Sequence, residues 1–359
     1  MLTTYFVDGA AAAGGTGGPN DPFDTIQKAI VAAEASNGPD SVHISSGIYN
    51  ENLVIEDSGK LTIQGNGATV KSAAGDEEHT IEIDDSAHIT IRDLVVVDGD
   101  DGIRADNVGS LKLVNVQASG NDDEGVQAEG IDNLTLIDVD ITGNGDRGVD
   151  AEDIGKIRLV DANLSDNADD GLRVVNADDV QIIGGTYNGS SDGDGIDLEV
   201  IASIDIRNIT ASNNSDEGLE VDDSGQIKVM GGNYNNNGGA GLDIDDTLDI
   251  RIAGIAAIGN GDHGLQIEVE DDADDDDIVV IRRVNITNSV FSNNVGDGIQ
   301  IMEEDGTTVE DVKITNVVVA NNTEFEPGDG GHGLFIDISG ELSLRNVTSE
   351  DNDVADVLP

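Results

Sequence analysis

The chain has 359 residues, of which 74 are Asp or Glu and 17 are Lys or Arg, so its formal net charge at pH 7 is −57. This charge excludes nucleic acid as a partner, because the phosphate backbone would be repelled. The chain has no cysteine, which excludes disulfide and thiolate chemistry, and no apolar run that is long enough to cross a membrane.

The first segment with a regular period is PFDTIQKAIVAAEA, which begins at Pro22. It is flanked by Gly and Pro turns and followed by SVHIS, which has the alternation of a β-strand. We expect a short helix that caps the open end of a strand stack, and we expect residues 1–98 to hold this cap and irregular first coils. The apolar residues at helical spacing are Ile26, Ala29, Ile30 and Ala33.

From residue 99 onward, glycine recurs at a nearly constant interval. Each glycine precedes Ile, Val or Leu, and an apolar residue follows two positions later, which is strand alternation rather than helical spacing. A period of about 20 to 50 residues indicates stacked repeats that bury one continuous core. The spacing is 23 residues with one step of 24 up to the eighth glycine, and then 34 and 35. The series is Gly102, Gly125, Gly148, Gly171, Gly195, Gly218, Gly241, Gly264, Gly298 and Gly333.

The two longer gaps predict loops that project from an otherwise unbroken solenoid. One gap contains Asp271 to Asp277 and the other contains Glu324 to Gly330. Insertions in repeat proteins usually form loops on one face. We therefore expect a single β-helix domain over residues 1–359, with regular coils in 99–359 and inserted loops near 270–278 and 323–331.

A second column lies four residues before the glycines. Asparagine tolerates left-handed turn geometry, and its amide bonds to the equivalent amide on the next coil, so we interpret this column as structural. Ser191, Asp98 and Asp329 fill the slots that lack asparagine. The asparagines are Asn121, Asn144, Asn167, Asn214, Asn237, Asn260 and Asn294.

The segment FVDGAAAAGGTGGPNDPFDTIQKAI, followed by SVHISSGIYNENLVI, resembles the start of right-handed parallel β-helix proteins of the pectin-lyase-like group. The later coils are similar to the generic repeats of that group, so the resemblance covers nearly the whole chain. It implies an all-β fold, a right-handed parallel β-helix with coils of about 23 residues and a short N-terminal capping helix. The group includes lyases, epimerases, hydrolases, tail spikes and non-catalytic surface proteins, so the resemblance does not select an activity.

Acidic residues gather at outward positions two and four residues after the glycines of three adjacent coils. Neighbouring carboxylates at one strand spacing repel by about 1 kcal/mol in water and by roughly 3 to 4 kcal/mol at an effective dielectric constant of 20. Hard oxygen ligands at this spacing suit Ca²⁺, and we predict a calcium site here. The alternative is a solvated acidic face that salt screens. The predicted ligands are Asp197, Glu199, Glu220, Asp222, Asp243 and Asp245.

Another acidic column lies two residues before the glycines. Asp before Gly is ordinary turn chemistry, so we favour that interpretation over ion binding. Its members are Asp100, Asp123, Asp146, Asp169, Asp216 and Asp262.

An aliphatic stripe is predicted on outward positions of the second strand of four coils: Val114, Ile137, Val160 and Ile183. Exposed contiguous apolar surface indicates self-association or a protein partner, unless a loop covers it. One strand position earlier runs a basic column that suits the acidic face of a neighbouring molecule. It consists of Lys112, Arg158, Lys228, Arg251 and Lys313.

No complete catalytic motif is found. A lyase or epimerase needs a base, an acid and a group that neutralises the substrate carboxylate. Arg173 is the best basic candidate, but a role in a charge-balanced ladder is favoured. The Asp-Pro-His-acid motif of alginate epimerases is absent. His263 and His332 directly precede glycines, so we interpret them as turn residues.

The sequence therefore favours an acidic β-helix, secreted or on the cell surface, that acts as a calcium-dependent structural, adhesive or surface-layer module. No N-terminal signal peptide is apparent, so this localisation requires another export route or a removed signal. One alternative is a polysaccharide lyase or C5-epimerase that uses Ca²⁺ to hold a uronate glycan. The other is a salt-adapted intracellular β-helix protein.

Overall fold

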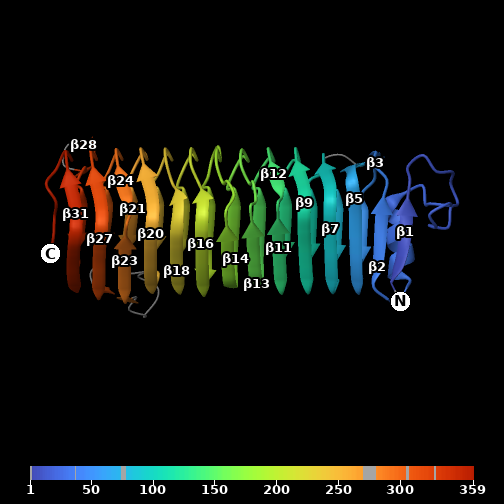
Figure 1. Cartoon of the computed structure of the whole chain (residues 1–359), viewed down its shortest axis with the longest axis horizontal. Helices are drawn as coiled ribbons and strands as arrows, with labels where there is room; N and C mark the ends of the chain where they lie inside the picture. Colours follow the sequence, from blue (N-terminus) through green and yellow to red (C-terminus); the bar gives the residue numbers. More distant parts are fainter. Residues whose placement is uncertain (1, 37, 74–77, 270–279, 305–306, 327–328) are drawn as a thin grey trace. The chain divides into compact units, whose positions relative to one another are not determined.

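The computed structural model describes residues 2–36, 38–73, 78–269, 280–304, 307–326 and 329–359. The chain forms two compact units, Met1–Arg173 and Val174–Pro359. In each unit, parallel strands are stacked side by side in successive coils (Figure 1). The predicted right-handed parallel β-helix is confirmed, whereas the single-domain organisation stays a prediction.

In the first unit, each coil contributes to three parallel ladders. The first ladder follows the glycine and runs through β4, β6, β8, β10 and the start of β13. The second runs through β1, β2, β5, β7, β9, β11 and the end of β13, and the third through β3, β5, β7, β9 and β12. The bounds are β1 Thr3–Val7, β2 Asp40–Ile44, β3 Ile48–Asn50, β4 Leu53–Glu56, β5 Lys60–Lys71, β6 Ile81–Asp84, β7 His88–Val97, β8 Ile103–Asp106, β9 Ser110–Ser119, β10 Val126–Glu129, β11 Asn133–Ile137, β12 Asp140–Thr142 and β13 Val149–Val160.

The second unit repeats this plan. Its first ladder is β15, β17, β19, β21, β25 and β30, and its second is β14, β16, β18, β20, β23, β27 and β31. The bounds are β14 Leu172–Ile183, β15 Ile196–Ile201, β16 Ser203–Thr210, β17 Leu219–Asp222, β18 Gln226–Asn233, β19 Leu242–Asp245, β20 Asp249–Ile258, β21 Leu265–Glu268, β22 Val280–Ile281, β23 Arg283–Thr287, β24 Val290–Ser292, β25 Ile299–Met302, β26 Thr308–Val309, β27 Asp311–Ala320, β28 Glu324–Glu326, β29 Asp329–Gly330, β30 Leu334–Asp337 and β31 Glu341–Glu350.

The predicted capping helix is α1 (Ile26–Glu34), and its four apolar residues at helical spacing are buried. It packs on β1, β2 and β4. Its first backbone N–H groups, those of Ile26 and Gln27, donate to the carboxylate of Glu51 at 3.0 Å. An anion at this position satisfies two N–H groups that the helix itself leaves without acceptors. The carboxylate of Glu51 therefore holds the start of the capping helix against the first coil. No described helix is long and apolar enough to span a membrane.

The periodic glycines are required by the close approach of successive coils. A Cβ atom on Gly148 would lie 2.5 Å from the carbonyl oxygen of Gly171 and 2.6 Å from Nδ2 of Asn167. The same clash recurs in the second unit, where a Cβ on Gly218 would lie 2.7 Å from the oxygen of Gly241. Side chains directly after the glycines are fully buried, for example Val149. Glycine thus marks the point where the chain enters the core-forming strand.

The asparagine column forms a buried ladder in both units. In the first unit, the backbone N–H and Nδ2 of Asn121 both donate to Oδ1 of Asn144, at 3.3 and 2.9 Å, and Asn144 bonds to Asn167 in the same way. In the second unit, the same bonds join each member to the next along the series Asn214, Asn237, Asn260, Asn294, Asn322 and Asn352.

Three predicted members of this column are wrong. Gly99 takes the slot predicted for Asp98, Ser190 takes that of Ser191, and Asn322 takes that of Asp329. In these coils the ladder residue does not lie four positions before the glycine, so counting back four residues from the glycine misplaces the slot.

The inserted segments differ in how much of them is described. Asp271 to Asp277 lies outside the described residues. The second insertion begins after Asn322 and ends at Gly333, so the chain returns to its coil positions. Within it, β28 and β29 pair as an antiparallel hairpin. Next to the first insertion, β22 and β26 form a separate pair of parallel strands.

Val200 is strained near the end of β15. Its φ is +57°, in the left-handed region, whereas the equivalent positions on the next two coils hold Asp223 and Asp246. The left-handed conformation costs a residue with a Cβ about 1–2 kcal/mol, and asparagine adopts it most readily after glycine. Val200 is 45% exposed, so its side chain adds little burial.

We expect Val200→Asn to raise the free energy of unfolding by about 1 kcal/mol. Urea unfolding of the variant and the parent protein measures this change. Val318→Asn is the control, because Val318 is similarly exposed but lies inside β27 at negative φ. A gain of equal size in the control would show that the backbone conformation is not the cause.

Candidate functional site

The structure brings the six predicted calcium ligands together on one face of the second unit. In the first ladder, Asp197 lies opposite Glu220, and Glu220 lies opposite Asp243. The second row follows two residues later, where Glu199 lies opposite Asp222. All six side chains are half-buried and alternate with fully buried apolar residues. We call these six residues the carboxylate grid.

Asp243 is the most constrained member of the grid. Its Oδ1 is enclosed and has no hydrogen-bond partner among the described residues. Burial, together with the charges of Asp245, Glu217 and Glu220, raises the pKa of Asp243 to about 9. At neutral pH without a cation, this carboxyl group therefore retains its proton.

Two further acids, Asp223 and Asp246, lie beside Asp222 of the grid, and the sequence prediction did not include them. Oxygens of Asp222, Asp223 and Asp246 lie within 4.8 Å of one another. Burial raises the pKa of Asp222, and the charge of Asp223 adds to this effect. Asp223 and Asp246 have positive φ and close the turns after β17 and β19. The Asp directly after each of these two strands could have indicated the additional ligands, but Asp at such a position is also typical of an ordinary turn.

A further column consists of the residues directly before the coil glycines, and we call it the turn column. At several positions among the described residues, a side chain of this column accepts a hydrogen bond from the backbone N–H of the next member. The acceptor and donor residues are Asp101 and Glu124, Asp194 and Glu217, Glu217 and Ala240, His263 and Asp297, and Asp297 and His332. His263 and His332 are therefore turn residues, as their position before glycine predicts.

At two pairs of consecutive acidic members of the turn column, the Asp directly before the second member joins the pair. Oxygens of Asp101, Asp123 and Glu124 lie within 4.8 Å of one another in the first unit. Oxygens of Asp194, Asp216 and Glu217 do so in the second unit. Asp123 and Asp216 belong to the acidic column for which the sequence favours turn chemistry over ion binding.

The model of the right handed beta helix region matches the chain over residues 30–187, 152–314 and 187–348. The chain belongs to the right-handed β-helix family. Its structure is similar to the A-module of mannuronan C-5 epimerase AlgE4 from Azotobacter vinelandii, with a TM-score of 0.63 and 17% identity over 99% of this chain and 100% of that chain. Polygalacturonase from Erwinia carotovora ssp. carotovora matches with a TM-score of 0.45 and 11% identity over 99% and 95% of the two chains.

At these identities, the likeness of the β-helix protein to the solved structures concerns the fold alone. No curated protein sequence matches the chain. The activities of those two proteins therefore do not transfer to this chain by similarity.

Arg173, the best basic candidate for catalysis, is held by two carboxylates of the first unit of the β-helix. Its Nη1 lies 3.2 Å from Oδ1 of Asp150 and 2.8 Å from Oε1 of Glu152. The ion pair between Arg173 and Asp150 is the kind of contact that a charge-balanced ladder contains, and the sequence favours this role for Arg173.

The predicted aliphatic stripe is half-buried in both units of the β-helix. Val114, Ile137 and Val160 lie opposite one another on adjacent strands of the first unit. In the second unit, Ile183 lies opposite Arg207, so the apolar surface does not continue there. A partner on the stripe stays a prediction.

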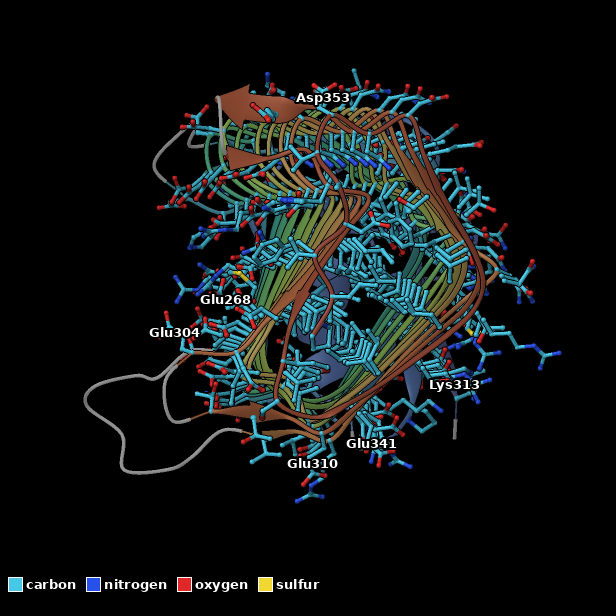
Figure 2. The ribbon with its side chains drawn as sticks, turned by 90° about the vertical axis from the view of Figure 1, so that its left-hand side faces the viewer. Glu268, Glu304, Glu310, Lys313, Glu341 and Asp353 are labelled. Carbon is cyan, nitrogen blue, oxygen red and sulfur yellow. The ribbon has the colours of Figure 1, made fainter. Side chains whose placement is uncertain are left out.

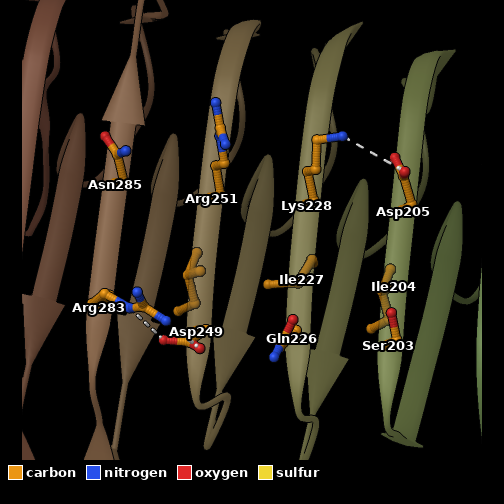
Figure 3. A pocket seen from close by; sticks show the side chains of 11 residues that line it. Ser203, Ile204, Asp205, Gln226, Ile227, Lys228, Asp249, Arg251, Arg283 and Asn285 are labelled. Atoms are coloured by element: carbon orange, nitrogen blue, oxygen red, sulfur yellow. Dashed lines mark hydrogen bonds and ion pairs between the residues drawn. The ribbon is translucent and has the colours of Figure 1, made fainter.

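Two members of the basic column, Lys228 and Arg251, line a groove of about 440 Å³ over β16, β18, β20 and β23 of the second unit (Figure 3). Lys228 is 3.6 Å from Asp205, and Arg283 forms two 2.9 Å hydrogen bonds to Asp249. Arg251, between them, is exposed and has no ion-pair partner among the residues that the structure describes. The groove therefore offers one unpaired cation.

The acidic and basic features occupy opposite sides of the second unit. Glu268, which lies opposite Asp245 and extends the second row of the grid, projects on one side of the coils, whereas Lys313 projects on the other (Figure 2). A ligand of one charge therefore meets a favourable surface on only one of these sides.

Proposed function

We propose that this β-helix protein is a calcium-dependent structural or adhesive module whose carboxylate grid binds Ca²⁺. The observation that carries the proposal is the enclosed Oδ1 of Asp243, which has no hydrogen-bond partner in the described part of the chain and is surrounded by other carboxylates. Such an oxygen is costly to leave unsatisfied. A hard cation satisfies it and cancels the repulsion between the neighbouring charges.

A structural role is favoured over catalysis because the best basic candidate is ion-paired and the histidines before glycine serve the turns. We place the protein outside the cell. A site on half-buried strand residues suits weak binding, and calcium-binding modules outside the cell have dissociation constants of about 10⁻⁴–10⁻³ M.

Thermal melting in calcium and in sodium at matched ionic strength tests the proposal. We expect the melting temperature to rise with micromolar to millimolar Ca²⁺, because an ion that binds only the folded state adds about 1.4 kcal/mol for each tenfold excess over its dissociation constant. Screening needs sodium at tenths of molar or more, since the Debye length is still about 10 Å at 0.1 M.

Two variants locate the response. The double variant Glu220→Gln, Asp222→Asn should lose the calcium response of the grid and be more stable than the parent without calcium, because it removes like-charge repulsion. The control Asp311→Asn, Glu341→Gln removes two acidic residues that also lie opposite each other, in β27 and β31. It should keep the response. If the parent protein gives equal melting curves in calcium and in sodium at the same ionic strength, calcium binding is contradicted and the acidic face is explained by salt adaptation.

The pH dependence gives a second readout. The pKa of Asp243 is about 9 in the folded protein against an ordinary 3.8. Between these values the folded state holds a proton that the unfolded state releases, so stability falls as pH rises from about 4 to about 9. Asp243→Asn should flatten this decline in the calcium-free protein. An unchanged pH profile, measured by urea unfolding, would contradict the assigned environment.

A second candidate function is binding of a uronate glycan, and the groove in Figure 3 favours it. Arg251 is exposed there, and the enclosed Oδ1 of Asn285 has no hydrogen-bond partner among the described residues. Guanidinium groups bind carboxylates, and an amide oxygen accepts bonds from sugar hydroxyls. Calorimetry with an oligouronate tests this function, and Arg251→Gln should abolish the binding.

A further inference from the structure

A cluster of three acids, Asp101, Asp123 and Glu124, lies where two coils of the first unit meet. We call it the turn-acid cluster. Asp101 is 2% exposed and Glu124 is 4% exposed, whereas Asp123 reaches solvent. One carboxylate oxygen from each residue lies within 4.8 Å of the other two. The cluster belongs to the first unit and shares no residue with the carboxylate grid.

The hydrogen bonds of the cluster leave one buried oxygen without a partner. Oδ1 of Asp101 accepts the backbone N–H of Glu124 at 3.2 Å, and its Oδ2 lies 2.9 Å from Nδ1 of His79. In contrast, Oε2 of Glu124 is enclosed and has no hydrogen-bond partner among the described residues. A buried carboxylate oxygen in this state is costly, and a bound cation would satisfy it.

Two coils further along, an arginine side chain fills the equivalent space. Arg147 precedes Gly148 as Asp101 precedes Gly102, and Asp169 and Asp170 precede the next glycine as Asp123 and Glu124 do. Nη2 of Arg147 is 2.9 Å from Oδ2 of Asp169, and its Nε is 3.0 Å from Oδ2 of Asp170. Where the turn column has a positively charged side chain, as at Arg147, the acids Asp169 and Asp170 of the next coil form ion pairs with it.

The same arrangement of three acids recurs in the second unit. Glu217 donates its backbone N–H to Oδ1 of Asp194 at 2.6 Å, as Glu124 does to Asp101, and Asp216 completes the set. Glu217 also adjoins Asp243 of the grid, so this copy is not an independent site. Its recurrence shows that the arrangement is a property of the coil geometry rather than of one loop.

We propose that Asp101, Asp123 and Glu124 bind a divalent cation, with Ca²⁺ preferred, at a site separate from the carboxylate grid. Ca²⁺ binds oxygens at about 2.3–2.6 Å, so ligands on opposite sides of the ion lie about 5 Å apart. Oxygens that lie within 4.8 Å of one another can therefore share one such ion. The exposed Asp123 provides an entry path, and water completes the coordination. Mg²⁺ fits less well, because it requires a smaller and stricter octahedron.

Equilibrium dialysis of the full chain against ⁴⁵Ca²⁺ tests the site, with Glu124→Gln as the first variant. The substitution keeps the shape of the side chain and removes its charge. We expect the number of bound ions to fall by one, with the affinity of that site weakened at least about 100-fold, as expected when a charged ligand is removed from a small site. Melting in chelator checks that the variant folds.

Asp101→Arg is the second variant, because it copies the arrangement of Arg147. It should lose the same ion and melt at a higher temperature than the parent in chelator, since the guanidinium replaces the cation. The grid variant Glu220→Gln, Asp222→Asn should keep this ion, which separates failure of the grid from failure of this cluster. The proposal is overturned if Glu124→Gln binds as many ions as the parent, or if the parent binds none in the first unit.

Discussion

Replacing Asn237 with alanine is expected to lower the free energy of unfolding of the second unit by about 4 kcal/mol. Asn237 is 3% exposed. Its Oδ1 accepts both the backbone N–H and Nδ2 of Asn214, at 3.1 and 3.2 Å, and its Nδ2 donates to the oxygen of Ala211 and to Oδ1 of Asn260. Alanine removes all four bonds inside the protein, where water cannot replace them.

The size of this loss follows from the donors that remain. Each buried donor left without an acceptor costs about 1–3 kcal/mol, and the substitution leaves two of them on Asn214. Urea unfolding of the variant measures the loss. The control is Asn316→Gly, because Asn316 also bonds to its copies on neighbouring coils but is exposed and has positive φ. We expect the control to lose less than about 0.5 kcal/mol. Similar losses in both variants would contradict the role of burial.

Replacing Gly148 with alanine is expected to destabilise the first unit by more than about 3 kcal/mol. The new Cβ would lie 2.5 Å from the backbone oxygen of Gly171 and 2.6 Å from Nδ2 of Asn167, which is held in place by its hydrogen bond to the oxygen of Ile141. The coils must separate locally to accept the methyl group. This separation stretches the ladder hydrogen bonds and opens the packed core beside them.

Gly59→Ala is the matched control in the same unit. A Cβ on Gly59 meets no atom within 4 Å, and the residue has no positive φ. We expect this variant to be unchanged or slightly more stable, since alanine restricts the unfolded chain. If the two glycine variants unfold at the same urea concentration, the close approach of the coils does not explain why glycine recurs at regular intervals in this chain.

The fold and the carboxylate grid could be predicted from the sequence because both depend on short, constant offsets from glycine. A strand begins directly after each glycine, so Asp197, Glu220 and Asp243 keep their register whatever happens elsewhere in the coil. The ladder slots near Asp98 and Ser191 were misplaced, because residues are lost or gained between the ladder and the glycine. Counting residues from the glycine predicts a position correctly only where no turn of variable length lies between the glycine and that position.

The turn-acid cluster could not be predicted in the same way, because the turn column has no constant residue type. Asp101, Glu124 and Arg147 are consecutive members of it. Their chemistry depends on which side chain meets which on the next coil, and composition does not reveal these pairs. A comparison of the residue before each glycine from coil to coil would have revealed both the acidic pairs and the arginine.

The asparagine ladder also constrains how this chain can change in evolution. Each member bonds to its copy on the neighbouring coil, so loss of one residue shifts every later side chain of that coil by one strand position and reverses the faces that it presents. Loss or duplication of a whole 23-residue period, such as the one from Gly218 to Gly241, instead joins equivalent slots and restores every bond. Single-residue deletions should therefore be rare within strands, and the coil rather than the residue is the step by which this protein can lengthen or shorten.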